Sequence, residues 1–517
     1  MPSTNWPQAK SFPSDVTVED PVPLAAFDAH DGTAPGPGDP WTKAIFVAHG
    51  MGQQVKFETV ETVARALEPW WEPQPGAEPK KVVVREVQVG EQRIHRAEIR
   101  LRRPEGKPGE PAFVDVHLYE AYWANLTEGK VALGDVFGFL WDAAWNGVKN
   151  ARGAFARWEF DHVVSYPIRE GRTIEKLVLA LLVIASLQAI QALAGVTSVT
   201  ALLLRQVHWP SAALLSALPR IVGAVLAPAV VAGIAIVLLH RRHGRGAAPL
   251  RPPAAVVGIA WGFAWLTIAA LVVAAVFGLW TLLSASGGAL ADEQSRWLAG
   301  GSWLLLFVLW WRLRYFLIQY VGDVAVYLSG HRVSKFNDIR QAIKETALAA
   351  GRAVYGAVAP GASRFAYGGV IVVGHSLGSV IAYDTLNALM RDDAFSGGKL
   401  RVAPRTELLL TLGSPLNKTA FIFRSQLGKD SEIREAMAAS VQPMIQSYRR
   451  PEWVNIYSRN DWISGPIQYY DDVAANPDAA RPVANEEDKS ATTPLAAHVE
   501  YWRGHLFAQT LWATLVS

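Results

Sequence analysis

The sequence contains no cysteine among its 517 residues. This absence excludes disulfide bonds, thiolate metal sites and a cysteine nucleophile. Charged residues are also scarce, because they make up only 18% of the chain, and the formal net charge is +3. No block of lysine or arginine has the length of a basic patch that binds nucleic acid, so we expect no nucleic-acid partner.

Several other signals are missing. The sequence has neither a P-loop nor a dinucleotide-binding glycine pattern, and His240 and His243 have no carboxylate neighbours. We therefore expect no cofactor and no bound metal. No basic segment followed by an apolar one opens the chain, so we expect no cleaved signal peptide. Residues 1–40 are rich in proline, glycine, aspartate and serine, which predicts a flexible N-terminal arm.

Long hydrophobic runs, in contrast, are prominent in the middle of the chain. The runs without any charged residue cover 177–204, 221–239, 252–291 and 297–311. The last run continues past Arg312 and Arg314 to residue 321. A bilayer core of about 30 Å needs roughly 20 apolar residues in a helix. We therefore predict an α-helical transmembrane insertion of about four helices at 171–325. The alternative is a lid of buried helices that crosses no membrane.

The segments on either side of this insertion, 41–170 and 326–517, have the strand and helix patterns of an α/β domain. If both halves belong to one sheet, the chain must return to the side of the membrane from which it left. The loop at 240–251 is rich in arginine, and the positive-inside rule assigns such a loop to the cytoplasm. We therefore expect an integral multi-pass membrane protein with the α/β domain on the cytoplasmic side.

The most specific motif is Gly-His-Ser-Leu-Gly at 374–378, which follows a run of β-branched residues and precedes a helical pattern. A nucleophile elbow requires this order of strand, sharp turn and helix. Gly374 and Gly378 provide the space that the turn needs. Ser376 is therefore the candidate nucleophile. Ser414 follows the next strand without such a motif, and we interpret it as part of the rim of the pocket.

The acid and the base of a hydrolytic triad follow the serine in chain order on this kind of sheet. Asp461 lies just after the strand pattern at 453–457, where the acid belongs, although a turn-forming aspartate is the alternative. Asp471 and Asp472 are reserve candidates in a looser loop. His498 lies at a junction between loop and helix. His505 lies two helical turns further on, about 10 Å away, and we favour His498 because a loop end reaches a site more readily.

The strand pattern at 44–48 ends in the sequence His-Gly-Met-Gly. An oxyanion hole on this fold combines an N–H group after the nucleophile with one from the turn after an early strand. We therefore predict that the N–H groups of Met51 and Leu377 are the donors. The residues expected to support this turn are His49, Gly50 and Gly52.

Together these residues resemble the α/β-hydrolase superfamily, specifically its lipase and esterase branch. The resemblance covers 41–170 and 326–517 and depends on the turn at 49–52, the elbow at 374–378, and Asp461 and His498. It implies a doubly wound, mostly parallel sheet and a triad of Ser376, His498 and Asp461. Soluble members of the superfamily have no insertion of this kind between the oxyanion turn and the elbow.

The sequence thus predicts a membrane-embedded serine hydrolase that cleaves acyl esters through an acyl-enzyme intermediate. The neighbouring bilayer favours a lipid-like substrate. An acyltransferase on the same fold, or a membrane scaffold without catalytic activity, are the alternatives. The partners expected are therefore the acyl-ester or lipid substrate and the bilayer, and the sequence indicates no particular protein partner.

Overall fold

The structure is a computed structural model of the 517-residue chain. The residues that it describes are 16–27, 33–52, 55–73, 81–104, 110–132, 135–136, 139, 155–159, 162–166, 322–329, 334–361, 363–419, 451–461, 463–467, 470, 483–492 and 497–517.

The described residues form an α/β domain and a separate two-stranded hairpin. The strands are β1 (Val16–Val18), β2 (Val22–Ala26), β3 (Thr42–Ala48), β4 (Trp71–Glu72), β5 (Val82–Val89), β6 (Gln92–Arg102), β7 (Phe113–Ala121), β8 (Phe155–Glu159), β9 (His162–Tyr166), β10 (Ala357–Val358), β11 (Gly369–His375), β12 (Thr406–Leu412), β13 (Glu452–Tyr457) and β14 (Ala484–Glu487). The α-helices are α1 (Glu58–Ala66), α7 (Gly322–Ser329), α8 (Ser334–Gly356), α9 (Leu377–Phe395), α10 (Val402–Arg405), α14 (Ala497–Glu500) and α15 (His505–Val516). Short 3-10 turns are η1 (Glu68–Trp70), η2 (Ala124–Leu126) and η5 (Tyr501–Arg503).

The main sheet has twelve strands, and its central path runs β10-β2-β5-β6-β7-β3-β11-β12-β13-β14. Every neighbouring pair from β7 to β14 is parallel. The pairs β5–β6, β6–β7, β4–β6 and β10–β2 are antiparallel. The prediction of a doubly wound, mostly parallel sheet is therefore corrected to a mixed sheet. The long strands β5, β6 and β7 pair antiparallel with one another and extend the parallel part of the sheet.

The two halves of the chain meet where β3 pairs in parallel with β11, from Gly369 opposite Lys43 to Gly374 opposite Ala48. Both strands are buried along their length. A parallel strand that is covered on both faces consists of nearly continuous apolar residues. The runs Ala-Ile-Phe-Val-Ala at 44–48 and Val-Ile-Val-Val at 370–373 are therefore neighbours in the sheet, although residues 49–369 lie between them in the sequence.

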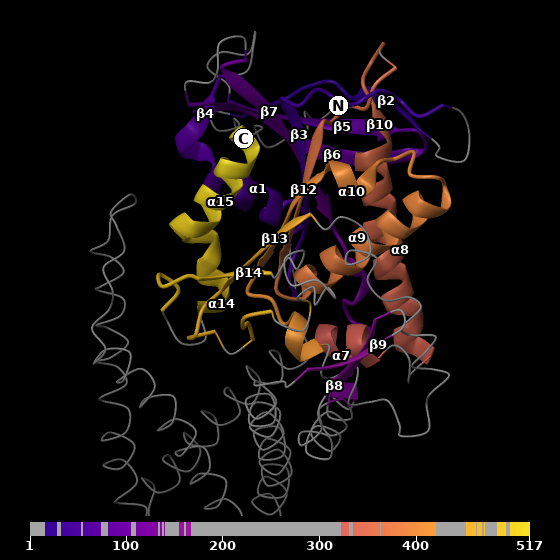
Figure 1. The fold of residues 1–517 in the computed structure, drawn as a ribbon, viewed down its shortest axis with the longest axis vertical. Coiled ribbons are helices and arrows are strands. Elements are labelled where there is room, and N and C mark those ends of the chain that lie inside the picture. Colours follow the sequence, from indigo (N-terminus) through magenta and orange to yellow (C-terminus); the bar gives the residue numbers. More distant parts are fainter. Residues whose placement is uncertain are drawn as a thin grey trace, which may run out of the picture.

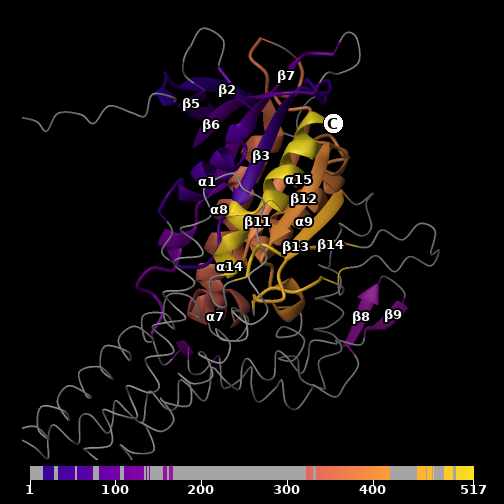
Figure 2. The same ribbon diagram turned by 90° about the vertical axis from the view of Figure 1, so that its left-hand side faces the viewer.

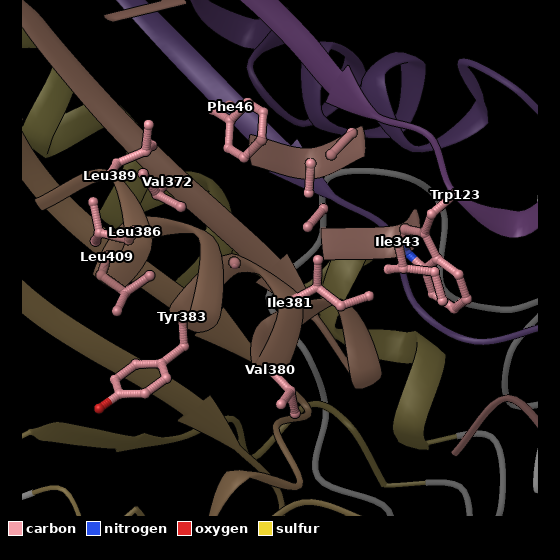
Figure 3. Close-up of a cluster of buried hydrophobic side chains, with 14 of the residues drawn as sticks. Phe46, Trp123, Ile343, Val372, Val380, Ile381, Tyr383, Leu386, Leu389 and Leu409 are labelled. Carbon is pink, nitrogen blue, oxygen red and sulfur yellow. The ribbon is translucent and has the colours of Figure 1, made fainter. Parts of the chain in front are cut away.

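Alternate residues of these strands belong to two different cores. Phe46 and Val372 lie in the core on one face of the sheet, whereas Ile45 and Ile371 lie in the core on the other. Helices α8 and α9 cover the first face, and α1 and α15 cover the second (Figure 1). Figure 3 shows part of the first core, in which Ile381 of α9 and neighbouring leucines pack near the strands. The result is a three-layer arrangement of helices, sheet and helices.

Part of the predicted N-terminal arm belongs to the sheet. Strand β1 pairs in parallel with β5, and β2 pairs with both β5 and β10. The prediction of a flexible arm is therefore wrong for residues 16–26. These strands are short and lie among prolines, so their alternation is too brief to be distinguished from a loop by periodicity.

The described part of the chain contains no helix with both the length and the apolar character needed to cross a membrane. This finding overturns the predicted transmembrane insertion and, with it, the multi-pass topology and the cytoplasmic assignment that depended on it. The hydrophobic runs used for that prediction lie outside the described residues. A helix that is hydrophobic on all sides can belong to the core of a large protein as well as to a membrane span, so hydropathy alone does not distinguish the two cases.

Candidate active site

Ser376 lies on a sharp turn between the end of β11 and the start of α9. Its backbone has φ 54° and ψ −130°, a conformation that costs a non-glycine residue about 1–3 kcal/mol. A Cβ atom added to Gly374 would lie 2.5 Å from the Cα of Ser379, and one on Gly378 would lie 2.2 Å from the carbonyl oxygen of His49. Both glycines are therefore required by close backbone approach, as a nucleophile elbow demands.

The side chains of Ser376, His498 and Asp461 form one hydrogen-bonded chain. The Ser376 Oγ lies 2.7 Å from Nε2 of His498, and the Nδ1 of His498 lies 2.8 Å from Oδ2 of Asp461. Ser376 follows β11, Asp461 follows β13, and His498 lies in α14. All three side chains therefore gather at the carboxyl ends of the parallel strands, where open α/β sheets bind their ligands.

The carboxylate of Asp461 determines which atoms carry protons in the hydrogen-bonded series from Ser376 through His498 to Asp461. An ionised carboxylate only accepts hydrogen bonds, so Nδ1 of His498 donates to Asp461. In the neutral imidazole Nε2 is then the acceptor, and the hydroxyl of Ser376 donates to it. Asp461 also accepts hydrogen bonds from the N–H of Ile463 and from the hydroxyl of Tyr501. Although burial raises the pKa of Asp461, the bonds from His498, Ile463 and Tyr501 hold that pKa well below its ordinary value.

Tyr501 is a part of the site that the sequence analysis missed. Its hydroxyl donates to Asp461 Oδ2 over 2.8 Å and accepts the N–H of Ser458 over 2.9 Å. Asp461 is thereby held against the end of β13. A signal for this role exists in the sequence, because Tyr501 follows His498 by three residues, a spacing that puts two side chains on the same side of a helical turn.

His375, the residue before the nucleophile, is a second contact that the sequence analysis did not predict. Its Nε2 donates to the backbone carbonyl of His498 over 2.7 Å, and the two rings lie 4.9 Å apart between centroids. Burial, together with the nearby His498, lowers the pKa of His375 to about 3, so the ring is neutral at physiological pH. A neutral ring with its proton on Nε2 is suited to this contact.

His49 stabilises the turn after β3, as expected for this residue from the sequence. Its Nδ1 donates to the carbonyl of Gly50 over 2.8 Å, and its Nε2 accepts the backbone N–H of Trp123 over 3.0 Å. The two rings stack with their centroids 4.7 Å apart. Burial lowers the pKa of His49 to about 4 despite the hydrogen bond to Gly50. A neutral His49 with one donor and one acceptor satisfies both contacts.

The turn at 49–52 lies directly against the elbow. A Cβ atom on Gly50 would lie 2.9 Å from Nδ1 of His375 and 3.2 Å from Cβ of Ser376. Met51 follows and is buried, and Leu377, also buried, opens α9 on the other side of Ser376. The two residues predicted as oxyanion donors therefore belong to the two segments that meet at the serine.

Ser414, in the loop interpreted as the rim of the pocket, is buried, and its hydroxyl lies 2.7 Å from that of Ser379. Ser379 in turn donates to the carbonyl of Ser376 over 2.6 Å. Gly413 of the same loop lies beside His498, because a Cβ atom added to it would lie 3.2 Å from Nδ1 of that histidine. Ser414 therefore supports the elbow from inside the protein, and the place of its loop in the pocket rim stays a prediction.

The remaining candidates are not part of this cluster. His505 is exposed at the start of α15, and the hydrogen bonds of His498 leave no place for it at Ser376. The reserve acids Asp471 and Asp472 lie outside the described residues. Within the described ranges, no group of three or more histidine, aspartate or glutamate side chains could hold a metal ion.

Comparisons with protein-family models, with curated proteins and with solved structures gave no match for this chain. The chemistry of the site therefore has to be argued from its own geometry.

Proposed function

We propose that the protein is a serine hydrolase of the α/β-hydrolase type that cleaves acyl esters. The observation that supports the proposal most strongly is the continuous chain of hydrogen bonds from Ser376 through His498 to Asp461. A serine with a histidine base, and an acid that orients that base, is the arrangement needed to activate a hydroxyl for attack on a carbonyl.

In the first half of the proposed reaction, the Ser376 oxygen attacks the acyl carbonyl carbon while Nε2 of His498 takes the hydroxyl proton. Negative charge develops on the carbonyl oxygen, and the N–H groups of Met51 and Leu377 would donate hydrogen bonds to it. Asp461 stabilises the resulting imidazolium. His498 then gives its proton to the departing alkoxide, which leaves as an alcohol, and an acyl group remains on Ser376.

In the second half, water replaces the alcohol. His498 takes a proton from water as the water oxygen attacks the acyl carbon, and the same N–H groups hold the second oxyanion. The intermediate collapses to release a carboxylic acid, and the proton on His498 returns to Ser376. The elbow favours this chemistry because the backbone conformation of Ser376 projects its hydroxyl from the turn above the first residues of α9.

A fluorophosphonate probe tests the proposal directly, because such probes phosphonylate an activated serine. We expect wild type to be labelled and Ser376→Ala to remain unlabelled at equal protein concentration. Ser363→Ala is the matched control, since it removes an exposed serine hydroxyl from the segment that precedes β11, and it should still be labelled. Folded wild type that does not react with the probe would exclude an activated Ser376.

Hydrolysis of p-nitrophenyl esters of increasing acyl length then measures the reaction itself. We expect Ser376→Ala to lower kcat by several orders of magnitude, because members of a triad act as a unit. Circular dichroism spectra of both proteins must superimpose. Residual turnover within tenfold of wild type would place the nucleophile elsewhere.

A further inference from the structure

Asp323, in the first turn of α7, makes a buried contact with the turn that follows β3. Its Oδ2 accepts the backbone N–H of Gly52 over 2.8 Å, and the residue is only 5% exposed. A buried carboxylate is costly unless hydrogen bonds compensate for the water that it loses. The buried Asp323 therefore depends on its hydrogen bonds, and the one that it accepts from Gly52 joins α7 to the turn after β3.

The position of Gly52 links this contact to the proposed oxyanion hole. Gly52 has φ 98° and directly follows Met51, whose N–H we propose as an oxyanion donor. Because a peptide unit is planar, a hydrogen bond to the N–H of Gly52 also fixes the orientation of the carbonyl of Met51. Asp323 thus restricts the backbone on the C-terminal side of the proposed donor.

The N-terminal side of Met51 is restricted by other contacts. Gly50 lies against Ser376 and His375, and His49 is held by Trp123. With both flanking peptides fixed, Met51 retains little backbone freedom. The direction of its N–H depends on that restriction, and oxyanion donors are effective only when they are already oriented before charge develops.

Helix α7 also packs against the segment that follows η2. A Cβ atom on Gly322 would lie 3.0 Å from a methyl carbon of Val131, so the start of α7 is closely packed there. Thr127 is a second hydrogen-bond partner of Asp323. Burial raises the pKa of Asp323 to about 6, while the bonds from Gly52 and Thr127 oppose that rise. In both ribbon views α7 lies at the same end of the molecule as α14, which carries His498 (Figures 1 and 2).

We propose that Asp323 is a positioning residue for the oxyanion turn, so that α7 completes the active site from outside the segments that supply the triad. This inference rests on the proposed function. It predicts that loss of the carboxylate impairs stabilisation of the tetrahedral intermediate more than it impairs substrate binding.

The test compares Asp323→Ala and Asp323→Asn with wild type in p-nitrophenyl ester hydrolysis and in inhibition by a trifluoromethyl ketone, which forms a tetrahedral adduct with serine. For Asp323→Ala we expect kcat to fall about 10- to 100-fold with KM nearly unchanged. The inhibition constant should rise in proportion. Asp323→Asn should recover part of the activity, because its amide oxygen can still accept the N–H of Gly52. Asp338→Ala, on the exposed side of α8, is the control and should behave as wild type.

The outcomes separate this inference from the proposed function. If wild type neither reacts with fluorophosphonate nor hydrolyses esters, the proposed function fails and Asp323 has no reaction to serve. If wild type is active and a folded Asp323→Ala keeps wild-type kcat and inhibition while losing only thermal stability, the positioning role is overturned. Should Asp323→Ala not fold, Asp323→Leu, which keeps the size of the side chain but cannot accept the N–H of Gly52, decides the question by the same two measurements.

Discussion

The ring of His375 donates a hydrogen bond to the backbone carbonyl of His498, so the residue before Ser376 holds the histidine that accepts the hydrogen bond of Ser376. His498 also contacts the elbow through its side chain, because its Nε2 accepts a hydrogen bond from the hydroxyl of Ser376. The elbow and α14 are thereby joined by two hydrogen bonds that the elbow donates, one to the backbone and one to the side chain of His498.

Replacement of His375 by phenylalanine should lower kcat about tenfold. The ring volume is retained, but the carbonyl of His498 loses its donor, and an unsatisfied buried acceptor costs about 1–3 kcal/mol. His505→Phe, at the exposed start of α15, is the matched control. Steady-state ester hydrolysis measures the effect. Equal kcat values for the two variants would mean that the contact does not position the base.

Replacement of Asp461 by asparagine should lower kcat by about four orders of magnitude. The amide can donate to Nδ1 of His498, which would then need its proton on Nε2 and could no longer accept from Ser376. The global fold should persist, because the shape of the side chain is unchanged. Stopped-flow measurement of acyl-enzyme formation checks the step directly. A loss smaller than tenfold would show that another group orients His498.

Replacement of Gly378 by alanine should lower the free energy of unfolding more than the same replacement at a glycine with free space around it. The added Cβ would meet the carbonyl oxygens of Ala48 and His49 at 2.2 Å, and both are backbone atoms that cannot rotate away. Gly129→Ala is the control, because Gly129 has a left-handed φ of +70° with nothing within 4 Å of the added carbon. We expect Gly129→Ala to cost about 1 kcal/mol and Gly378→Ala to cost several times more, as measured by urea denaturation.

Protonation of His49 should weaken the fold in mild acid. The pKa is lowered in the folded state to about 4 from an ordinary value of 6.5, so the unfolded chain binds the proton first as pH falls. The stabilisation is complete above about pH 6.5 and is lost progressively down to about pH 4, with a total of about 3 kcal/mol.

The measurement is the free energy of unfolding of wild type and His49→Gln at pH 7 and at pH 4.5. Glutamine can still accept the N–H of Trp123 but does not titrate. The decline between the two pH values should be smaller in the variant. The comparison isolates His49, because the other groups with shifted pKa values, such as Asp323 and His375, are present in both proteins. An identical decline in the two proteins would show that His49 does not titrate in this window.

The elbow could be predicted from the sequence because its requirements are local. A strand, two glycines and a helix adjoin one another, and the same short segment specifies the strained turn at Ser376. Asp461 and His498 could be selected from chain order and from their places after a strand and before a helix. Their convergence is shown by their distances, whereas their catalytic roles remain a proposal.

The contacts of Asp323 and His375 could not be predicted in this way. Asp323 meets Gly52 from a helix 271 residues away in sequence, and no local pattern marks an aspartate as the partner of a distant peptide. The burial of Ser414 also depends on tertiary packing, since its sequence neighbours are those of an ordinary loop. The membrane prediction failed for a different reason, because hydropathy reports that a segment avoids water and not what covers it.

The backbone of Ser376 has a conformation that glycine would adopt without steric cost. A glycine at this position would relieve about 1–3 kcal/mol of backbone strain, but it would remove the hydroxyl that donates to Nε2 of His498. Stability and reactivity thus favour different residues at position 376. The proposed chemistry gives a reason for serine at a position where the backbone conformation favours glycine.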